Sequence, residues 1–250
     1  MDTRLLKLNF KTYLLALSDL IMPRVCVVCR RPLYLRERCV CLKCRAGLPY
    51  TYNEKMPHNP MADRYNEQIN RKEPESQEPY QWAVALLRYE NASLFNRIPQ
   101  SLKYEKNLYA GRYFSRQLAG KIKTSPQFKD VDLIIPVPLH PRRQWKRGYN
   151  QAAVIAGVLS EELGVPMDTK LLRRTRNTTS QTKKTHEERQ SNVADAFALN
   201  TRRLHVLEGK KHILLVDDVF TTGATLTECH KKIRTATIAA RISVATLSCV

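Results

Sequence analysis

Four short apolar runs along the chain predict the strands of a sheet. They cover residues 82–89, 131–137, 212–216 and 241–247. The third run is β-branched and leucine-rich without polar alternation, as expected for a parallel strand covered on both faces. Helical patterns of apolar positions occupy the segments between these runs, namely residues 94–103, 108–122, 150–163 and 225–234. Strands that alternate with helices predict an α/β fold with a doubly wound parallel sheet.

The N-terminal segment 5–22 is apolar but interrupted by Lys7, Lys11 and Asp19. Its leucines fit one face of an amphipathic helix. The uncharged stretch is too short to span a bilayer, and no small-residue cleavage site follows it. We expect a helix that packs on its own protein rather than on a membrane, no transmembrane segment, and a cytoplasmic protein.

Two further stretches show little apolar periodicity. Residues 53–79 are rich in Asn, Glu, Gln, Arg and Pro, which predicts a linker or a mobile insertion. The basic, Thr- and Gln-rich run 170–203 predicts a mobile hood or loop subdomain. The predicted organisation is an N-terminal amphipathic helix, a cysteine module, a polar linker or insertion and an α/β domain, over residues 1–22, 23–50, 51–80 and 81–250.

The composition of the chain is globular, but its charge is unusual. Of 250 residues, 43% are hydrophobic, and 42 Lys and Arg face 23 Asp and Glu for a formal net charge of +19. Such a field attracts polyanions, including nucleic acids, polyphosphates and nucleotides. Composition alone does not choose among these partners.

The most informative motif follows the third strand. Asp217 and Asp218 stand at its carboxyl end, where open α/β sheets place their ligands. Gly223 permits a tight turn, and the hydroxyls and backbone N–H groups around it suit a phosphate. A P-loop is excluded because no Gly-Lys-Ser/Thr follows, and the dinucleotide GxGxxG is absent. The alternative is an ordinary strand-to-helix turn capped by a threonine.

A basic segment follows the second strand, which ends at Val137. Within residues 138–151 it concentrates four cations and a glycine, namely Arg142, Arg143, Lys146, Arg147 and Gly148. Guanidinium groups neutralise a pyrophosphate through bidentate contacts, and a glycine lets the backbone approach it closely. The alternative is a solvated basic loop.

Five of the seven cysteines fall between residues 26 and 44. Two CxxC pairs, Cys26/Cys29 and Cys41/Cys44, are separated by eleven residues and predict a tetrahedral zinc site with a structural role. Disulfides fit poorly with an intracellular chain, and a redox role fits poorly with paired motifs. Cys39 stands beside the second pair and leaves the ligand set slightly open.

The Val-Asp-Asp-Val-Phe-Thr-Thr-Gly-Ala-Thr segment resembles the ribose-phosphate motif of type I phosphoribosyltransferases. Together with the double CxxC, Pro-Val-Pro-Leu-His-Pro-Arg-Arg, Arg-Gly-Tyr-Asn-Gln-Ala and the stretch 180–189, it is similar to the ComF (GntX-like) family. These are bacterial phosphoribosyltransferase-fold proteins associated with natural competence, the uptake of DNA. The resemblance implies a type I phosphoribosyltransferase fold with a small hood, preceded by a zinc finger.

The resemblance also implies a role for each segment. The acidic pair, as candidate catalytic residues, would contact the ribose hydroxyls of phosphoribosyl pyrophosphate (PRPP). The 5′-phosphate would be bound by Val219, Phe220, Thr221, Thr222, Gly223, Ala224 and Thr225. The pyrophosphate side would be shaped by Arg142, Arg143, Lys146, Arg147, Gly148, Tyr149, Asn150 and Gln151. A flexible loop near the site would contain Gln181, Arg189 and Asn192. Zinc would be bound by Cys26, Cys29, Cys41 and Cys44.

Two functions remain open at this stage. One is a magnesium-dependent transferase in which a nucleophile displaces pyrophosphate from PRPP, with Asp217 and Asp218 helping to hold the ion. No base-recognition segment is identifiable, so the acceptor stays unassigned. The other is a competence factor that binds single-stranded DNA, through cations interleaved with Trp145 and Tyr149, and contacts the DNA-uptake machinery. The positive charge serves either function equally well.

Overall fold

The computed structural model describes residues 10–71, 78–176 and 196–250. Its strands are β1 (Ala83–Arg88), β2 (Leu133–Pro136), β3 (Leu172–Arg174), β4 (Phe197–Leu199), β5 (His212–Phe220) and β6 (Arg241–Cys249). Its α-helices are α1 (Phe10–Ile21), α2 (Leu42–Ala46), α3 (Pro60–Asn70), α4 (Arg97–Tyr104), α5 (Leu108–Thr124), α6 (Pro141–Arg147), α7 (Gln151–Leu163) and α9 (Ala224–Arg234). Short 3₁₀ turns occupy Asn53–Lys55, Leu94–Asn96, Pro126–Phe128 and Thr201–Leu207.

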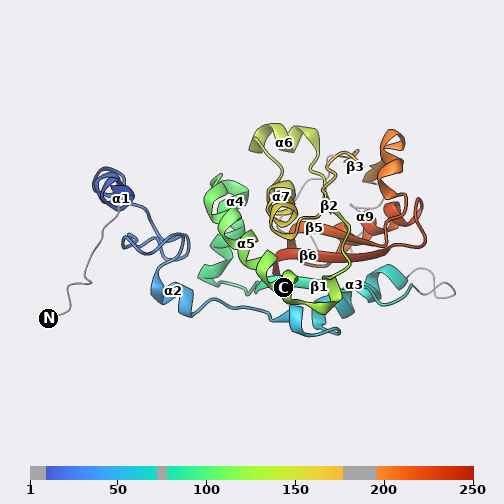
Figure 1. Cartoon of the computed structure of the whole chain (residues 1–250), viewed down its shortest axis with the longest axis horizontal. Coiled ribbons are helices and arrows are strands. Elements are labelled where there is room, and N and C mark those ends of the chain that lie inside the picture. The colour runs from blue at the N-terminus through green and yellow to red at the C-terminus, as the bar shows by residue number, and fades with distance from the viewer. Residues whose placement is uncertain (1–9, 72–77, 177–195) are drawn as a thin grey trace.

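The main sheet has four strands in the order β1-β6-β5-β2, and all its neighbouring pairs are parallel (Figure 1). Alternate side chains of β5 enter two different cores. Leu214 and Val216 pack in the cluster that contains α5 and α7, whereas Ile213 and Leu215 pack in the cluster that contains α3 and α9. A strand covered on both faces needs apolar residues at every position. The predicted doubly wound sheet is therefore confirmed.

Both outer strands of this sheet are covered by irregular segments. Along β1, the Arg88 N–H donates to the carbonyl of Pro49 (2.7 Å) and the Thr51 N–H donates to that of Leu86 (3.2 Å). Along β2, residues 166–168 run beside Ile134 and exchange two backbone hydrogen bonds with it. These contacts satisfy backbone groups that an exposed edge would offer to other chains.

Helix α3 lies inside the stretch expected to be a polar linker, and that expectation was wrong for residues 60–70. Asn59 caps the helix by accepting a hydrogen bond from the Ala62 N–H (3.0 Å). Met61, Tyr65 and Ile69 recur at a spacing of four and are buried against the sheet. Three apolar positions on one face are enough for a helix that covers a sheet. The polar residues between them hide the helical period of apolar positions in the sequence.

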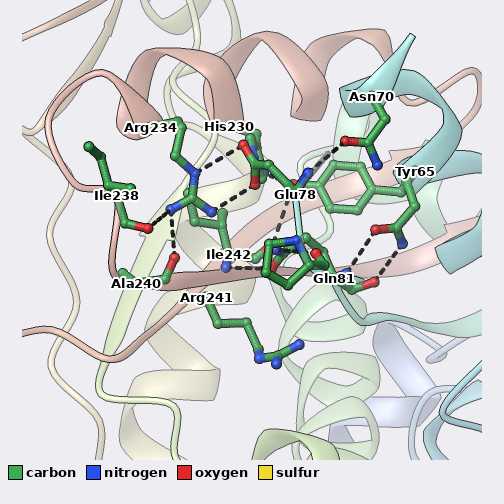
Figure 2. Close-up of polar contacts among 12 residues, drawn as sticks. Tyr65, Asn70, Glu78, Gln81, His230, Arg234, Ile238, Ala240, Arg241 and Ile242 are labelled. Atoms are coloured by element: carbon green, nitrogen blue, oxygen red, sulfur yellow. Dashed lines mark hydrogen bonds and ion pairs between the residues drawn. The ribbon is translucent and has the colours of Figure 1, made fainter. Parts of the chain in front are cut away.

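A buried polar network joins the segment after α3 to α9 (Figure 2). The Nδ1 of His230 lies 2.7 Å from the Tyr65 hydroxyl, and its Nε2 lies 2.8 Å from a carboxylate oxygen of Glu78. Arg234 donates to both oxygens of the same carboxylate, at 3.0 and 2.8 Å. Burial opposes ionisation of Glu78, but the hydrogen bonds from His230 and Arg234 outweigh it and lower the pKa of Glu78 to about 2. This network fixes α9, whose first residue follows the threonine-glycine turn.

Two short described segments of the expected hood, β3 and β4, form a small antiparallel ribbon rather than a loop. In it, β3 pairs with β4, so that Leu172 lies opposite Leu199. This ribbon corresponds to the small hood expected beside the sheet. The expected loop residues Gln181, Arg189 and Asn192 lie outside the described residues.

The N-terminal helix α1 lies away from the sheet and its helices (Figure 1). The side chains of Leu17, Leu20 and Ile21 are exposed, the last two by 82% and 83%. The expectation that this helix packs on its own protein is therefore wrong for these side chains. Across the part of the chain that the structure describes, no helix is long and apolar enough to cross a membrane.

Candidate functional site: an acidic pair beside two helix N-termini

The acidic pair lies within β5, not after it. Asp217 is in register with Thr246 of β6, and the pairing continues as far as Phe220. The strand is therefore four residues longer than predicted, because backbone pairing with β6 does not depend on apolar side chains. Since side chains alternate along a strand, Asp217 projects on the α9 side and Asp218 on the α5 side.

Lys103 forms an ion pair with Asp218 that the sequence did not predict. Its Nζ lies 3.0 Å from Oδ2 of the carboxylate, and the Asp218 side chain is only 8% exposed. Burial disfavours the charged amine, but the carboxylates of Asp218 and Asp217 outweigh it and raise the pKa of Lys103 above its ordinary value. Lys103 is the last but one residue of α4, and nothing in its local sequence marks it as a partner for β5.

The carboxyl of Asp217 is held with a raised pKa. Burial, and then the neighbouring Asp218 carboxylate, raise the pKa of Asp217 from 3.8 to about 7, against the opposing effects of Lys103 and Arg174. Asp217 is therefore partly protonated near neutral pH. A ligand that donates hydrogen bonds or carries a cation favours the ionised form.

The turn after the acidic pair is short and requires glycine. Thr221 and Thr222 precede Gly223, which adopts φ +83° and caps the N-terminus of α9. A Cβ on Gly223 would lie 2.8 Å from the Phe220 ring, so a side chain is excluded by both space and backbone conformation. The turn therefore presents two hydroxyls beside the positive end of a helix, an arrangement that suits a phosphate.

The expected basic loop is largely a helix. Residues Pro141–Arg147 form α6, and His140 caps its start, where the His140 Nδ1 accepts from the Arg142 N–H at 3.3 Å. Gly148 ends the helix with φ +86° and donates to the Gln144 carbonyl at 2.7 Å. A Cβ on Gly148 would meet nothing within 4 Å. The left-handed turn, rather than a close approach of the backbone, explains this glycine.

Helix α6 divides the predicted pyrophosphate residues between two faces. Arg147 lies over the Tyr104 ring, 5.7 Å from its centre, and donates to the Gln151 side chain at 3.1 Å. Arg143 is partly buried on the same face, and burial together with the charges of Arg174 and Arg147 lowers the pKa of Arg143. The opposite face carries Arg142, Trp145 and Lys146, all exposed, with Trp145 exposed by 90%.

Hydrogen bonds through Val137 place the N-terminus of α7 beside the residue that precedes the acidic pair. Asn150 accepts from the Ala152 N–H (3.1 Å) and donates from its amide to the Val137 carbonyl (2.9 Å). The Val137 N–H in turn donates to the Val216 carbonyl at 2.8 Å, one residue before Asp217. The Tyr149 hydroxyl, beside the cap, donates to the carbonyl of Leu102. Two helix N-termini, of α7 and α9, thus lie at the carboxyl ends of neighbouring strands.

Gln151, the first residue of α7, offers an unsatisfied donor at this place. Its side chain is buried, and its Nε2 atom has no hydrogen-bond partner among the described residues. A buried amide without an acceptor is costly, so an acceptor from a ligand would stabilise it.

The four predicted metal-binding cysteines come together in space. All their Sγ atoms lie within 4.8 Å of one another, and those of Cys29 and Cys41 are 3.7 Å apart. Tetrahedral zinc with Zn–S bonds of about 2.3 Å has S–S edges of about 3.8 Å. Burial opposes the Cys26 thiolate, but N–H groups of Cys29 and Cys41 outweigh it and lower the pKa of Cys26 to about 7. The cluster can hold a metal such as zinc.

Cys39 lies outside this four-cysteine set. It is buried, and burial raises the pKa of its thiol to about 12. Its side chain packs in the hydrophobic cluster that also contains Val27 and Val40. The structure therefore assigns Cys39 to the core.

The cysteine module is docked on α4. The guanidinium of Arg97 donates to the Val28 carbonyl at 2.8 Å, and Arg30 forms an ion pair with Glu105 just after the helix. Val27 and Val28 share one hydrophobic cluster with Leu102. The helix that carries Lys103 to Asp218 is thus also the helix on which the cysteine module rests.

Comparison with known proteins agrees with this arrangement. A family model described as phosphoribosyl transferase matches residues 114–249, more than half of the chain. Competence protein F of Haemophilus influenzae is 35% identical over 138 residues, covering 54% of this chain and 59% of that protein. DNA utilization protein YhgH of Escherichia coli O157:H7 is 30% identical over 224 residues, covering 84% of this chain and 90% of that protein.

Among solved structures, the glutamine PRPP amidotransferase of B. subtilis, complexed with ADP and GMP, matches with a TM-score of 0.36 and 18% identity. That match covers 56% of this chain and 26% of the amidotransferase chain. The family assignment rests instead on the family model and on the sequence relatives, of which the Escherichia coli protein aligns with 84% of this chain. The chain belongs to the ComF family of phosphoribosyltransferase-like proteins.

Proposed function

We propose that this protein binds PRPP or a related ribose phosphate at the acidic pair, and that it serves DNA handling during competence with single-stranded DNA as a second ligand. The observation that carries the proposal is the convergence of the acidic pair, the Thr221–Gly223 turn and the N-terminus of α7 at one edge of the parallel sheet. Carboxylates accept hydrogen bonds from ribose hydroxyls, and helix N-termini bind phosphates.

Each part of the proposed site has its own task. Asp217 and Asp218 accept the ribose hydroxyls, and the threonine turn holds the 5′-phosphate. Arg147 and Gln151 face the pyrophosphate side, where the amide of Gln151 lacks an acceptor among the described residues. The flanking helix dipoles add to the positive field without any side-chain movement.

Magnesium fits the proposed site by the chemistry of its donors. Two adjacent carboxylates supply the hard oxygen ligands that magnesium takes, alongside phosphate oxygens. When bound, the ion would neutralise charge on the pyrophosphate. Asp217 and Asp218 would hold it, while the cations of α6 would orient the phosphate groups.

The proposed DNA surface is the outer face of α6 together with the cysteine module. Arg142, Trp145 and Lys146 place two cations beside an exposed indole. The cysteine module adds the ring of Tyr34, which is 70% exposed and lies beneath Arg31, together with several exposed cations. These cations are Arg30, Arg31, Arg36, Arg38, Lys43 and Arg45. Cations on phosphates and aromatic rings under bases hold single strands without sequence preference. The relatives are named for competence and for DNA utilization, which supports this role.

A transferase that acts on an unidentified nucleobase or amine, with no direct DNA role, is the second candidate. The pKa of about 7 at Asp217 supports it, because such a carboxyl can accept a proton from an attacking nucleophile near neutral pH. A turnover assay with PRPP and a panel of amines and nucleobases tests this function. Release of pyrophosphate that depends on one acceptor would support the transferase function. If no acceptor causes release of pyrophosphate, only the proposed binding function remains.

A calorimetric titration of PRPP with magnesium, run with and without single-stranded DNA, tests both proposed ligands together. We expect PRPP to bind in either case, and DNA to bind with an affinity that falls steeply as salt rises. A change in PRPP affinity when DNA is present would measure the coupling between the two sites. Absence of PRPP binding, or DNA binding that salt does not affect, would contradict the corresponding half of the proposal.

A further inference from the structure

We propose that Lys103 is a tethered counter-cation of the acidic pair, which the divalent cation of an incoming ligand must displace. The inference rests on the proposed function of the pair and adds to it a residue that sets the affinity for the cation. Lys103 comes from α4, outside both predicted ligand segments.

The geometry places the ammonium where a metal would compete for the same carboxylate. Nζ of Lys103 lies 3.0 Å from Oδ2 of Asp218. A magnesium ion coordinated by that carboxylate would lie about 2 Å from its oxygen. Two cations this close in a partly buried site repel each other strongly. Binding of the divalent ion therefore requires the ammonium to withdraw.

The helix that carries Lys103 is fixed, whereas the end of the side chain is free to withdraw. The Leu102 carbonyl accepts from Tyr149, and the Tyr104 ring lies beneath Arg147, so both neighbours of Lys103 are engaged. Arg97 anchors the start of α4 to the cysteine module. The Lys103 side chain itself remains 28% exposed. The ammonium can thus leave Asp218 for solvent without movement of the helix.

The proposed role predicts that loss of the Lys103 charge strengthens, rather than weakens, binding of a divalent cation. Removing the ammonium leaves two neighbouring carboxylates without their cation, which increases their attraction for any other cation. A neutral residue at position 103 should therefore strengthen divalent cation binding. Loss of a residue that contacts the ligand, or of one that only supports the fold, would weaken it.

The test measures binding of Mn²⁺ alone, by the electron paramagnetic resonance signal of the free ion, to the zinc-loaded full chain at pH 8. The variants are Lys103→Met and Lys103→Gln, which remove the charge, and Lys103→Arg, which keeps it. Lys123→Met is the matched control, because Lys123 is exposed on α5 and carries the same charge. Bound zinc keeps the thiolates occupied, and Mn²⁺ prefers oxygen ligands.

We expect both neutral variants to bind Mn²⁺ about tenfold more tightly, a change of about 1.4 kcal/mol. Lys103→Arg and Lys123→Met should match the wild type. Unchanged or weaker Mn²⁺ binding in folded Lys103→Met and Lys103→Gln would overturn the inference. Thermal melting establishes that each variant is folded. Because methionine is apolar and glutamine is polar, the test still stands if one of the two neutral variants fails to fold.

A parallel PRPP titration of the wild type separates this inference from the proposed function. If PRPP binds but the neutral variants do not gain Mn²⁺ affinity, the role of Lys103 is refuted and the ligand assignment stands. If Mn²⁺ binds more tightly to the variants while PRPP fails to bind, the counter-cation role stands and the ligand assignment is refuted.

Discussion

Asp217 makes the stability of the fold depend on pH in a direction opposite to most carboxyls. Its pKa is raised from 3.8 to about 7, so the folded state holds a proton that the unfolded state releases. The stabilisation from this proton is complete below pH 3.8 and is lost as pH rises through 7. Near neutral pH the acidic pair thus lowers the stability of the fold, as functional sites often do.

Asp217→Asn should stabilise the protein above pH 7, by roughly 1–3 kcal/mol after allowance for partial exposure and coupling to Asp218. Asparagine keeps the oxygen that accepts from the Asp218 N–H and cannot ionise. Urea unfolding of both proteins between pH 5 and 8.5 measures the difference, which should grow with pH. Asp130→Asn, at an exposed position, is the control. A difference that does not change with pH would contradict the raised pKa.

Glu78 makes the stability of the fold depend on pH in the direction opposite to Asp217. Its pKa is depressed to about 2 from 4.5, so its stabilisation is present above 4.5 and is lost as pH falls towards 2. Glu78→Gln removes the charge that faces His230 and Arg234, and should cost about 2–4 kcal/mol at pH 7. Chemical unfolding at pH 7 and pH 3 measures the cost, which should shrink at the lower pH. The exposed Glu67→Gln on α3 should cost little at either pH.

At the scale of elements, α4 is the link between the cysteine module and the acidic pair. Arg97→Met removes the guanidinium that donates to the Val28 carbonyl. A hydrogen bond of this charged kind contributes about 1.5–3 kcal/mol. We expect zinc to leave the variant several-fold faster in excess chelator, as followed with a zinc-sensitive dye. Arg112→Met, exposed on α5, should release zinc at the wild-type rate. Equal rates in all three proteins would show that the contact does not hold the module.

The outer face of α6 is the element that the DNA proposal depends on most. Trp145→Ala should weaken single-stranded DNA binding by about 1–3 kcal/mol with little change in salt dependence, since stacking releases no counterions. Replacing Arg142 and Lys146 with Gln should instead lower the salt slope by about 0.7 for each cation. Fluorescence anisotropy over a salt series measures both quantities. Ile238→Ala removes another fully solvated apolar side chain and should have no effect.

The sequence predicted the main elements because their apolar periods are strong, and it misplaced those whose signals are local and polar. β5 continues through Asp217 to Phe220 because pairing with β6 carries it past the last apolar run. Helix α6 arises from Pro141 at its first position and Gly148 at its end, although its basic sequence predicted a loop. The cysteine cluster and the acidic pair were predictable from spacing. Lys103 was not, because only the tertiary fold brings it to Asp218.

At the scale of the whole molecule, one line of contacts runs from the cysteine cluster through α4 to the acidic pair. Val28 accepts from Arg97 at one end of the helix, and Lys103 pairs with Asp218 at the other. The proposed DNA surface borders both ends, since it comprises the cysteine module and α6. The chain carries a net charge of +19, whereas the two residues proposed to contact the ribose are acidic. In the proposed function, the net positive charge attracts a polyanion, and the acidic pair binds hydroxyls and a cation.

The central claim is that the acidic pair binds a ribose phosphate, and one calorimetric comparison tests it most directly. The wild type and the double variant Asp217→Asn with Asp218→Asn are titrated with PRPP at saturating magnesium, after zinc content and melting temperature establish that both are folded. We predict that the wild type binds PRPP and that the double variant loses at least a hundredfold in affinity, about 2.8 kcal/mol. A wild type that fails to bind PRPP at any magnesium concentration, or a double variant that binds equally well, would contradict the account.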